Sequence, residues 1–175
     1  MMTNTPAAIH PFEVAGLGRA PFRCIDVVER TYVACQGATV QPGGSCAFCG
    51  QGIKTCCVIK SADGRKFDVG SDCVAQLAKD CARTDNERAA RALVDAANAI
   101  KTRKANARKD VAIEAARETF AANRETLDGM IWDGVVKHSH GPRSVGAQLE
   151  WMFSNGGRTL KMRAVKILAA LLVTK

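Results

Sequence analysis

Runs rich in strand-forming residues occur in the first half of the chain, a pattern typical of β-strands. The stretch from Phe22 to Ala34 is rich in strand-forming residues. Two further runs, Lys54 to Lys60 and Lys66 to Val69, flank the sequence Ala62-Asp63-Gly64-Arg65. Because Asp-Gly is a preferred pair for a two-residue type I′ turn, we expect a β-hairpin that pairs with the preceding strand.

The expected turn also predicts which side chains share a face of the hairpin. A turn centred on Asp63-Gly64 pairs Val58 with Val69 and Cys56 with Ser71. Period-two alternation then predicts one apolar face, made of Cys56, Val58, Phe67 and Val69.

The sequence from Ser71 to Asp128 has neither glycine nor proline, which favours helix. A first helix is expected from about Asp72 to Ala82, and Thr84 with Glu87 matches a capping box for a second. Apolar positions then recur at spacings of three and four residues. One helix of about 44 residues would be about 65 Å long. An α-hairpin that breaks near Asn106 to Asp110 fits the pattern equally well.

A further amphipathic helix is expected near the C-terminus. Its apolar stripe consists of Leu160, Ala164, Ile167, Leu168 and Leu171, with basic residues around it. The stretch from Gly129 to Val145 is expected to be a loop. It contains His138 and His140, and we interpret this His-x-His pair as a feature of the loop rather than as a metal site.

Cysteines carry the clearest chemical signal in the chain. Cys46-Ala47-Phe48-Cys49-Gly50 is a C-x2-C-G knuckle, and Cys73 follows Cys49 by 24 residues at the start of the expected first helix. A knuckle, a hairpin and a cysteine at a helix start occur in that order in treble-clef zinc fingers. Cys46, Cys49 and Cys73 are therefore the predicted Zn2+ ligands.

A structural zinc site needs a fourth ligand. The positions one helical turn after Cys73 are Gln76 and Leu77, which are not zinc ligands. The predicted register places Cys56 on the apolar face near Cys73, so Cys56 is the first choice. Cys35 and then Cys57 are the alternatives, while Cys24 and Cys81 are expected to be core thiols.

Most of the net charge of +8 belongs to the last quarter of the chain, where residues 134–175 hold seven basic residues and one acid. A second concentration lies in the long helical segment, which has no acid between Asp95 and Asp110. Such rows can contact a nucleic-acid backbone, although a solvated helix face or a surface for a membrane or an acidic protein explains them as well. The candidate phosphate contacts are Lys101, Arg103, Lys104, Arg108, Lys109, Arg158, Lys161, Arg163 and Lys166.

The predicted fold class is α+β. It consists of a small β-hairpin or treble-clef-like zinc module with N-terminal strands, a long Ala-rich helix or α-hairpin, and a C-terminal basic amphipathic helix. The expected segments are a flexible tail (1–13), the β-rich zinc module (14–82), the long helical segment (83–130) and a loop with the C-terminal helix (131–175).

Composition excludes several classes of protein. At 47% hydrophobic residues the chain is not disordered, and its longest apolar stretch, Ile167 to Val173, is too short to span a membrane. No secretory signal is evident, so the eight cysteines are not expected to form disulfides, and a reducing cytoplasm is the expected location.

Several short motifs together resemble a group of uncharacterised zinc-finger proteins of bacteriophages and mobile elements. The motifs are Gly16-Leu17-Gly18-Arg19-Ala20-Pro21-Phe22, Gly43-Gly44-Ser45-Cys46 with Cys49-Gly50, Ser61-Ala62-Asp63-Gly64 and Val69-Gly70-Ser71-Asp72-Cys73-Val74. The resemblance covers roughly residues 14–80. It implies a zinc knuckle and, for a phage protein, the host cytoplasm, but no established activity.

The sequence thus favours a non-enzymatic, zinc-containing protein that binds nucleic acid, DNA rather than RNA. The alternative is an adaptor or inhibitor that binds a host protein through the Ala-rich helix, which could also mediate a homodimer. No phosphate loop, nucleophile elbow or H-E-x-x-H motif supports an enzyme.

Overall fold

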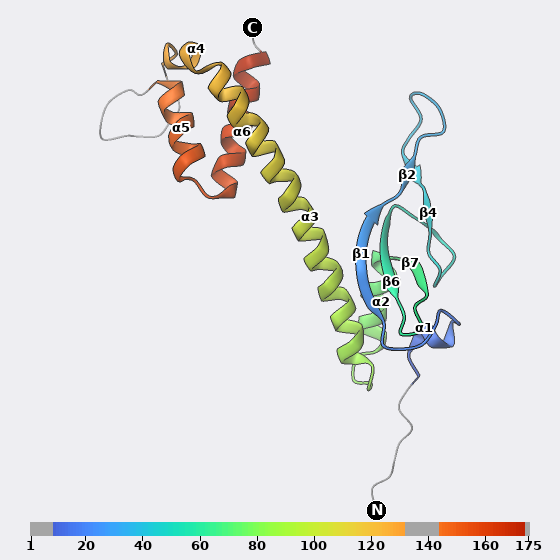
Figure 1. Ribbon diagram of the computed structural model, residues 1–175. Helices are drawn as coiled ribbons and strands as arrows, with labels where there is room; N and C mark the ends of the chain where they lie inside the picture. Colours follow the sequence, from blue (N-terminus) through green and yellow to red (C-terminus); the bar gives the residue numbers. More distant parts are fainter. Residues whose placement is uncertain (1–8, 132–143, 174–175) are drawn as a thin grey trace, which may run out of the picture. The chain divides into compact units, whose positions relative to one another are not determined.

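A computed structural model describes residues 9–131 and 144–173. It confirms the α+β class: antiparallel strands come first, and a long helix and shorter helices follow (Figure 1). The strands are β1 (Arg23–Glu29), β2 (Thr31–Tyr32), β3 (Gln41–Pro42), β4 (Gly44–Ser45), β5 (Gly52–Ile53), β6 (Thr55–Lys60) and β7 (Lys66–Gly70). The helices are α1 (Pro11–Val14), α2 (Ser71–Asp80), α3 (Glu87–Ala122), α4 (Arg124–Asp128), α5 (Val145–Asn155) and α6 (Arg158–Val173).

The main sheet has three antiparallel strands in the order β1-β6-β7, so the first strand pairs with the hairpin as the sequence predicts. Two small ribbons accompany it. The pair β2-β3 extends away from the sheet (Figure 1), and the pair β4-β5 forms the base of the cysteine knuckle.

The predicted register of the β6-β7 hairpin is wrong by one residue. Cys57 pairs with Val69 and Cys56 with Gly70. The turn is three residues long instead of two: the Ser61 N–H donates to the Arg65 carbonyl, and only Gly64 takes a positive φ, of 87°. This is the geometry of a type I turn followed by a glycine bulge. Since a shift of one residue moves every side chain to the opposite face, Cys57 and not Cys56 joins the apolar face.

Part of the segment predicted to be a flexible tail, residues 1–13, forms a helix. Residues 1–8 lie outside the described residues, but Pro11–Val14 form the short helix α1, and the Phe12 side chain is fully buried. Its ring packs edge-on against Phe22, Phe48 and Phe67 at centroid distances of 5.3 to 5.6 Å. Because Phe48 belongs to the cysteine knuckle, α1 supports that knuckle directly.

A first hydrophobic core lies between the sheet, α2 and the first part of α3. Val27, Cys57, Ile59 and Val69 contribute from the strands. The helices contribute Val74, Leu77, Leu93 and Ala97. This packing fixes α2, and with it Cys73, against the edge of the hairpin.

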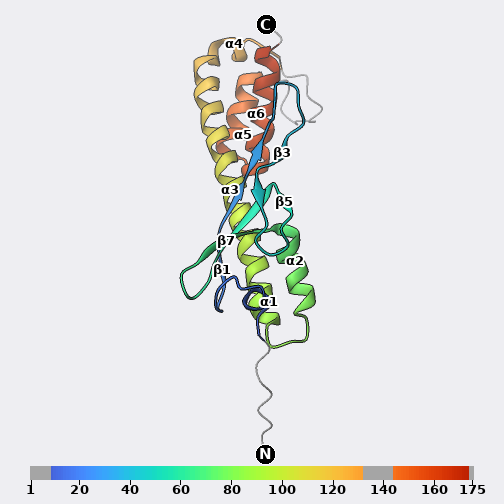
Figure 2. The same ribbon diagram turned by 90° about the vertical axis from the view of Figure 1, so that its right-hand side faces the viewer.

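The helix α3 is continuous over 36 residues, so the alternative of an α-hairpin near Asn106 to Asp110 is wrong. Its last part packs with α5 and α6 around a second core that includes Phe120, Leu149 and Leu168 (Figure 2). The sequence analysis did not anticipate α5. Of the described helices, none is long and apolar enough to cross a membrane.

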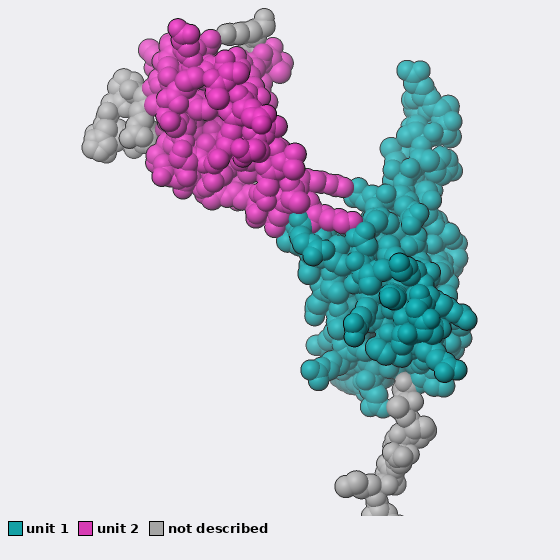
Figure 3. Space-filling model, viewed as in Figure 1, with its two compact units in different colours: residues 1–103 teal, residues 104–175 magenta. Residues whose placement is uncertain are grey.

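The chain divides into two compact units, residues 1–103 and 104–175 (Figure 3). The boundary falls within α3, so one helix contributes to the cores of both units. The cysteine knuckle belongs entirely to the first unit.

Candidate metal centre

The C-x2-C-G motif forms a tight turn at the end of the β4-β5 ribbon. The Gly50 N–H donates to the Cys46 carbonyl at 2.8 Å, and the Cys46 N–H donates to the Gln51 carbonyl at 2.8 Å. Gly50 takes a φ of +76°, which glycine adopts without steric cost. The turn therefore directs the side chains of Cys46 and Cys49 to the same side.

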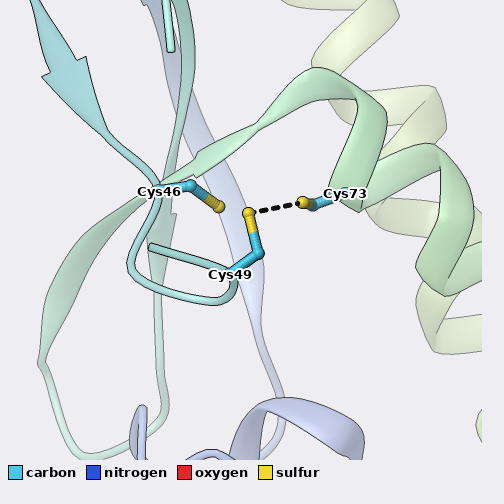
Figure 4. A group of neighbouring side chains, drawn as sticks. All are labelled: Cys46, Cys49 and Cys73. Carbon is cyan, nitrogen blue, oxygen red and sulfur yellow. Dashed lines mark hydrogen bonds between the residues drawn. The ribbon is translucent and has the colours of Figure 1, made fainter. Parts of the chain in front are cut away.

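The helix α2 brings the third cysteine to this turn. Gly70 is its N-cap residue, and Cys73 lies in its first turn. The Cys73 and Cys49 sulfurs are 3.4 Å apart (Figure 4). The Gly70 N–H donates to the Cys46 sulfur at 3.4 Å. All three sulfurs lie within 4.8 Å of one another.

This group of three cysteines fits a metal ion such as zinc. A tetrahedral zinc with Zn–S bonds of about 2.3 Å separates its sulfur ligands by about 3.8 Å, close to the spacing seen here. Cys46 is buried, Cys73 is partly buried and Cys49 is exposed. The ion would thus lie at the edge of the first core, where it joins the knuckle to α2.

The electrostatics of the three thiols also favour a cation. Burial opposes ionisation of Cys46, but hydrogen bonds from the backbone N–H groups of Gly70, Cys49 and Phe48 outweigh it and lower its pKa. Burial and the neighbouring sulfurs of Cys49 and Cys46 raise the pKa of Cys73 to about 12. A cation bound to these sulfurs would offset the repulsion between neighbouring thiolates.

Cys56, the predicted fourth ligand, is not part of this group. The corrected register turns its side chain to the face opposite Cys57, and a Cβ added at Gly44 would lie 2.6 Å from its sulfur. Burial and the nearby Asp68 carboxylate raise the pKa of its thiol. Cys56 therefore fills the space beneath the strand β4.

The two alternative ligands also lie elsewhere. Cys35 is exposed in the connection between β2 and β3, outside the three-cysteine group. Cys57 is fully buried in the first core beside Cys24. Cys81 is a buried core residue as predicted. His138 and His140 lie outside the described residues.

The candidate phosphate contacts differ in exposure. Arg103, Arg108, Lys109, Arg163 and Lys166 are exposed, as is Arg158, but the Arg158 guanidinium binds both carboxylate oxygens of Asp110 at 2.8 and 3.1 Å. Lys101, Lys104 and Lys161 are only partly exposed. Of the three basic residues Lys101, Lys104 and Arg108 of α3, only Arg108 is therefore exposed.

Neither a protein-family model, nor a curated protein, nor a solved structure matches this chain. The resemblance to phage zinc-finger proteins thus gains no support from these comparisons. What stands is a group of three cysteines, suited to a metal ion, in a small α+β protein.

Proposed function

We propose that this protein is a zinc-binding, non-enzymatic protein that contacts the phosphate backbone of nucleic acid through lysines and arginines on its helices. The zinc would stabilise the knuckle against α2, since ligand binding contributes directly to folding in small zinc modules. A zinc bound by three thiolates carries a net negative charge, which disfavours ionisation of a bound water. For that reason we assign the metal a structural role.

One observation carries the nucleic-acid part of the proposal. Five cations and no acid occupy the stretch of α3 between Asp95 and Asp110, and three of them, Arg103, Arg108 and Lys109, are exposed. Basic side chains on a helix, with no acidic residue among them, can contact a row of phosphates without contacting the bases. Arg163 and Lys166 add exposed positive charge on α6.

A protein partner is the second candidate. The apolar side chain of Val111 is 71% exposed on the Ala-rich helix α3. A position that faces only water would favour a polar side chain. Tyr32, Val33 and Val40 are about half exposed in the β2-β3 segment. Either surface could pack against another protein or a second copy of this chain.

The salt dependence of binding tests the first candidate. Affinity for unrelated duplex DNA sequences should be similar and should fall with a log–log slope near −0.9 per phosphate contacted. Replacing Arg103, Arg108 and Lys109 with alanine should flatten that slope by about two to three units without loss of fold, because all three side chains are exposed. Fluorescence anisotropy over a salt series measures both quantities.

The matched control removes the same charge away from α3, with alanine at Lys60, Lys66 and Lys79, which are exposed residues of β6, β7 and α2. In this variant the log–log slope of affinity against salt should remain close to that of the wild type. An equal loss in both variants would indicate a response to net charge alone. Absence of binding to DNA or RNA below about 10 μM at low salt would contradict the proposal and favour the protein partner.

A further inference from the structure

The three-cysteine group leaves one coordination position of a tetrahedral zinc without a ligand. Within residues 9–131 and 144–173, no other His, Cys, Asp or Glu joins the group. Structural zinc sites are normally closed by four ligands. The fourth ligand therefore has to come from outside the described group.

A cavity of about 260 Å³ borders this group. Cys49 and Cys73 both line it, so an ion bound to their sulfurs would lie at its wall. Cys46 does not line it, because its side chain is buried and accepts the Gly70 N–H. The cavity therefore reaches the three-cysteine group from the side of Cys49 and Cys73.

The walls of the cavity combine polar and apolar groups. Besides Ile53, they include the exposed side chains of Lys54 and Asp72, together with Gln51, Thr55 and Ser71. The volume is several times the roughly 30 Å³ that one water occupies in the liquid. The cavity thus has room for a small molecule, with one cationic and one anionic group to receive it.

We propose that the fourth zinc position binds the sulfur of a small zwitterionic thiol that enters this cavity. Thiolate is the softest common zinc ligand and suits a site that is already made of sulfur. The Lys54 ammonium would receive the carboxylate of the thiol, and the Asp72 carboxylate its ammonium group. On binding, the thiol loses its proton to solvent, a Zn–S bond forms, and a Zn–water bond breaks.

This inference depends on the proposed zinc binding, so metal content is measured first. Full-length protein purified without thiols should hold about one zinc per chain. X-ray absorption should then show three sulfur neighbours and one oxygen. Addition of L-cysteine should change this to four sulfurs, with the zinc still bound after gel filtration. L-serine, which offers a hydroxyl in place of the thiol, should change nothing.

The affinity for L-cysteine can be measured with the cobalt-substituted protein. Its sulfur-to-cobalt absorption should increase and saturate with L-cysteine. Lys54→Ala and Asp72→Asn should each weaken the binding of L-cysteine about two- to fivefold, as for exposed charge pairs, while the uncharged β-mercaptoethanol should bind both variants as it binds the wild type.

Several outcomes would overturn the inference while leaving zinc binding intact. Four sulfur neighbours before any thiol is added would show that the protein closes the site itself. The protein would also be shown to supply the fourth ligand if Asp72→Asn removed the oxygen bound to zinc. Loss of a zinc-bound nitrogen in the double variant His138→Ala, His140→Ala would show the same. No response to L-cysteine, or loss of zinc to it, would also refute the thiol site. Absence of metal at the outset would instead refute the proposed function.

Discussion

Cys49 and Cys57 place the same side chain in opposite environments. Cys49 is exposed, and its sulfur lies 3.4 Å from that of Cys73, whereas Cys57 is fully buried in the first core. Cys49→Ser should reduce bound zinc from about one to below about 0.2 per chain and unfold much of the knuckle and α2. Elemental analysis with circular dichroism measures both effects.

Cys57→Ser is the matched control, because it makes the same chemical change at a buried site that is not a ligand. It should keep the zinc but lower the free energy of unfolding by about 1–3 kcal/mol, since a hydroxyl replaces a thiol among apolar side chains. Zinc loss in Cys57→Ser, or full zinc content in Cys49→Ser, would contradict the assignment of ligands.

His10 makes the stability of the first unit depend on pH. The residue is 2% exposed, its Nδ1 accepts the Phe12 N–H at 3.2 Å, and its ring lies 4.6 Å from that of Phe22. Burial lowers the pKa of His10 below 6.5, with Glu13 opposing the shift. The unfolded chain thus takes up the proton more readily. The stability due to neutral His10 is complete above pH 6.5 and is lost as the pH falls below it.

Urea unfolding of the zinc-loaded protein at pH 7.5 and 5.5 tests this effect. Protonation of zinc-bound thiolates also depends on pH, so the informative quantity is the difference from His10→Gln, which retains a hydrogen-bond acceptor but does not titrate. The wild type should lose more stability than His10→Gln on acidification. Equal losses would show that His10 contributes nothing to the pH dependence.

At the scale of elements, hydrophobic periodicity predicted the strands β1, β6 and β7, the helix α2 and most of α3, because each has a regular apolar pattern, whereas the two-residue strands β3, β4 and β5 were not predicted. The turn between β6 and β7, by contrast, was predicted with the wrong length. The Asp63-Gly64 pair fits both a two-residue turn and the observed turn with a bulge at Gly64, and the two differ by one residue in register. This shift of one residue in register decides whether the side chain of Cys56 or that of Cys57 faces the core.

Two other elements depend on tertiary contacts that local patterns do not show. The helix α1 has only four residues and is held by the burial of Phe12 against aromatic residues distant in sequence. In α5, Ser144 caps the first turn, and Gly146 lies so close to the Asp128 side chain that an added Cβ would overlap it. The cysteine spacing, by contrast, was sufficient to predict Cys46, Cys49 and Cys73 as neighbours.

At the scale of the whole molecule, the described residues form two hydrophobic cores and one group of cysteines suited to a metal ion. The group lies in residues 1–103, and the second core lies in residues 104–175. The helix α3 contributes Leu93 to the first core and Phe120 to the second. Loss of the metal should therefore destabilise the first unit more than the second. The boundary between the destabilised and the unaffected part should lie within α3.

Hydrogen exchange with and without a zinc chelator measures this difference. Chelation should increase amide exchange in β4, β5 and α2, which the metal joins, and in the part of α3 before residue 104 that packs on them. Amides of α5 and α6 should keep their protection, because their core contains none of the three cysteines. The same chelator saturated with zinc is the control and should change neither unit. Uniform deprotection of both units would show that the two cores unfold as one cooperative structure.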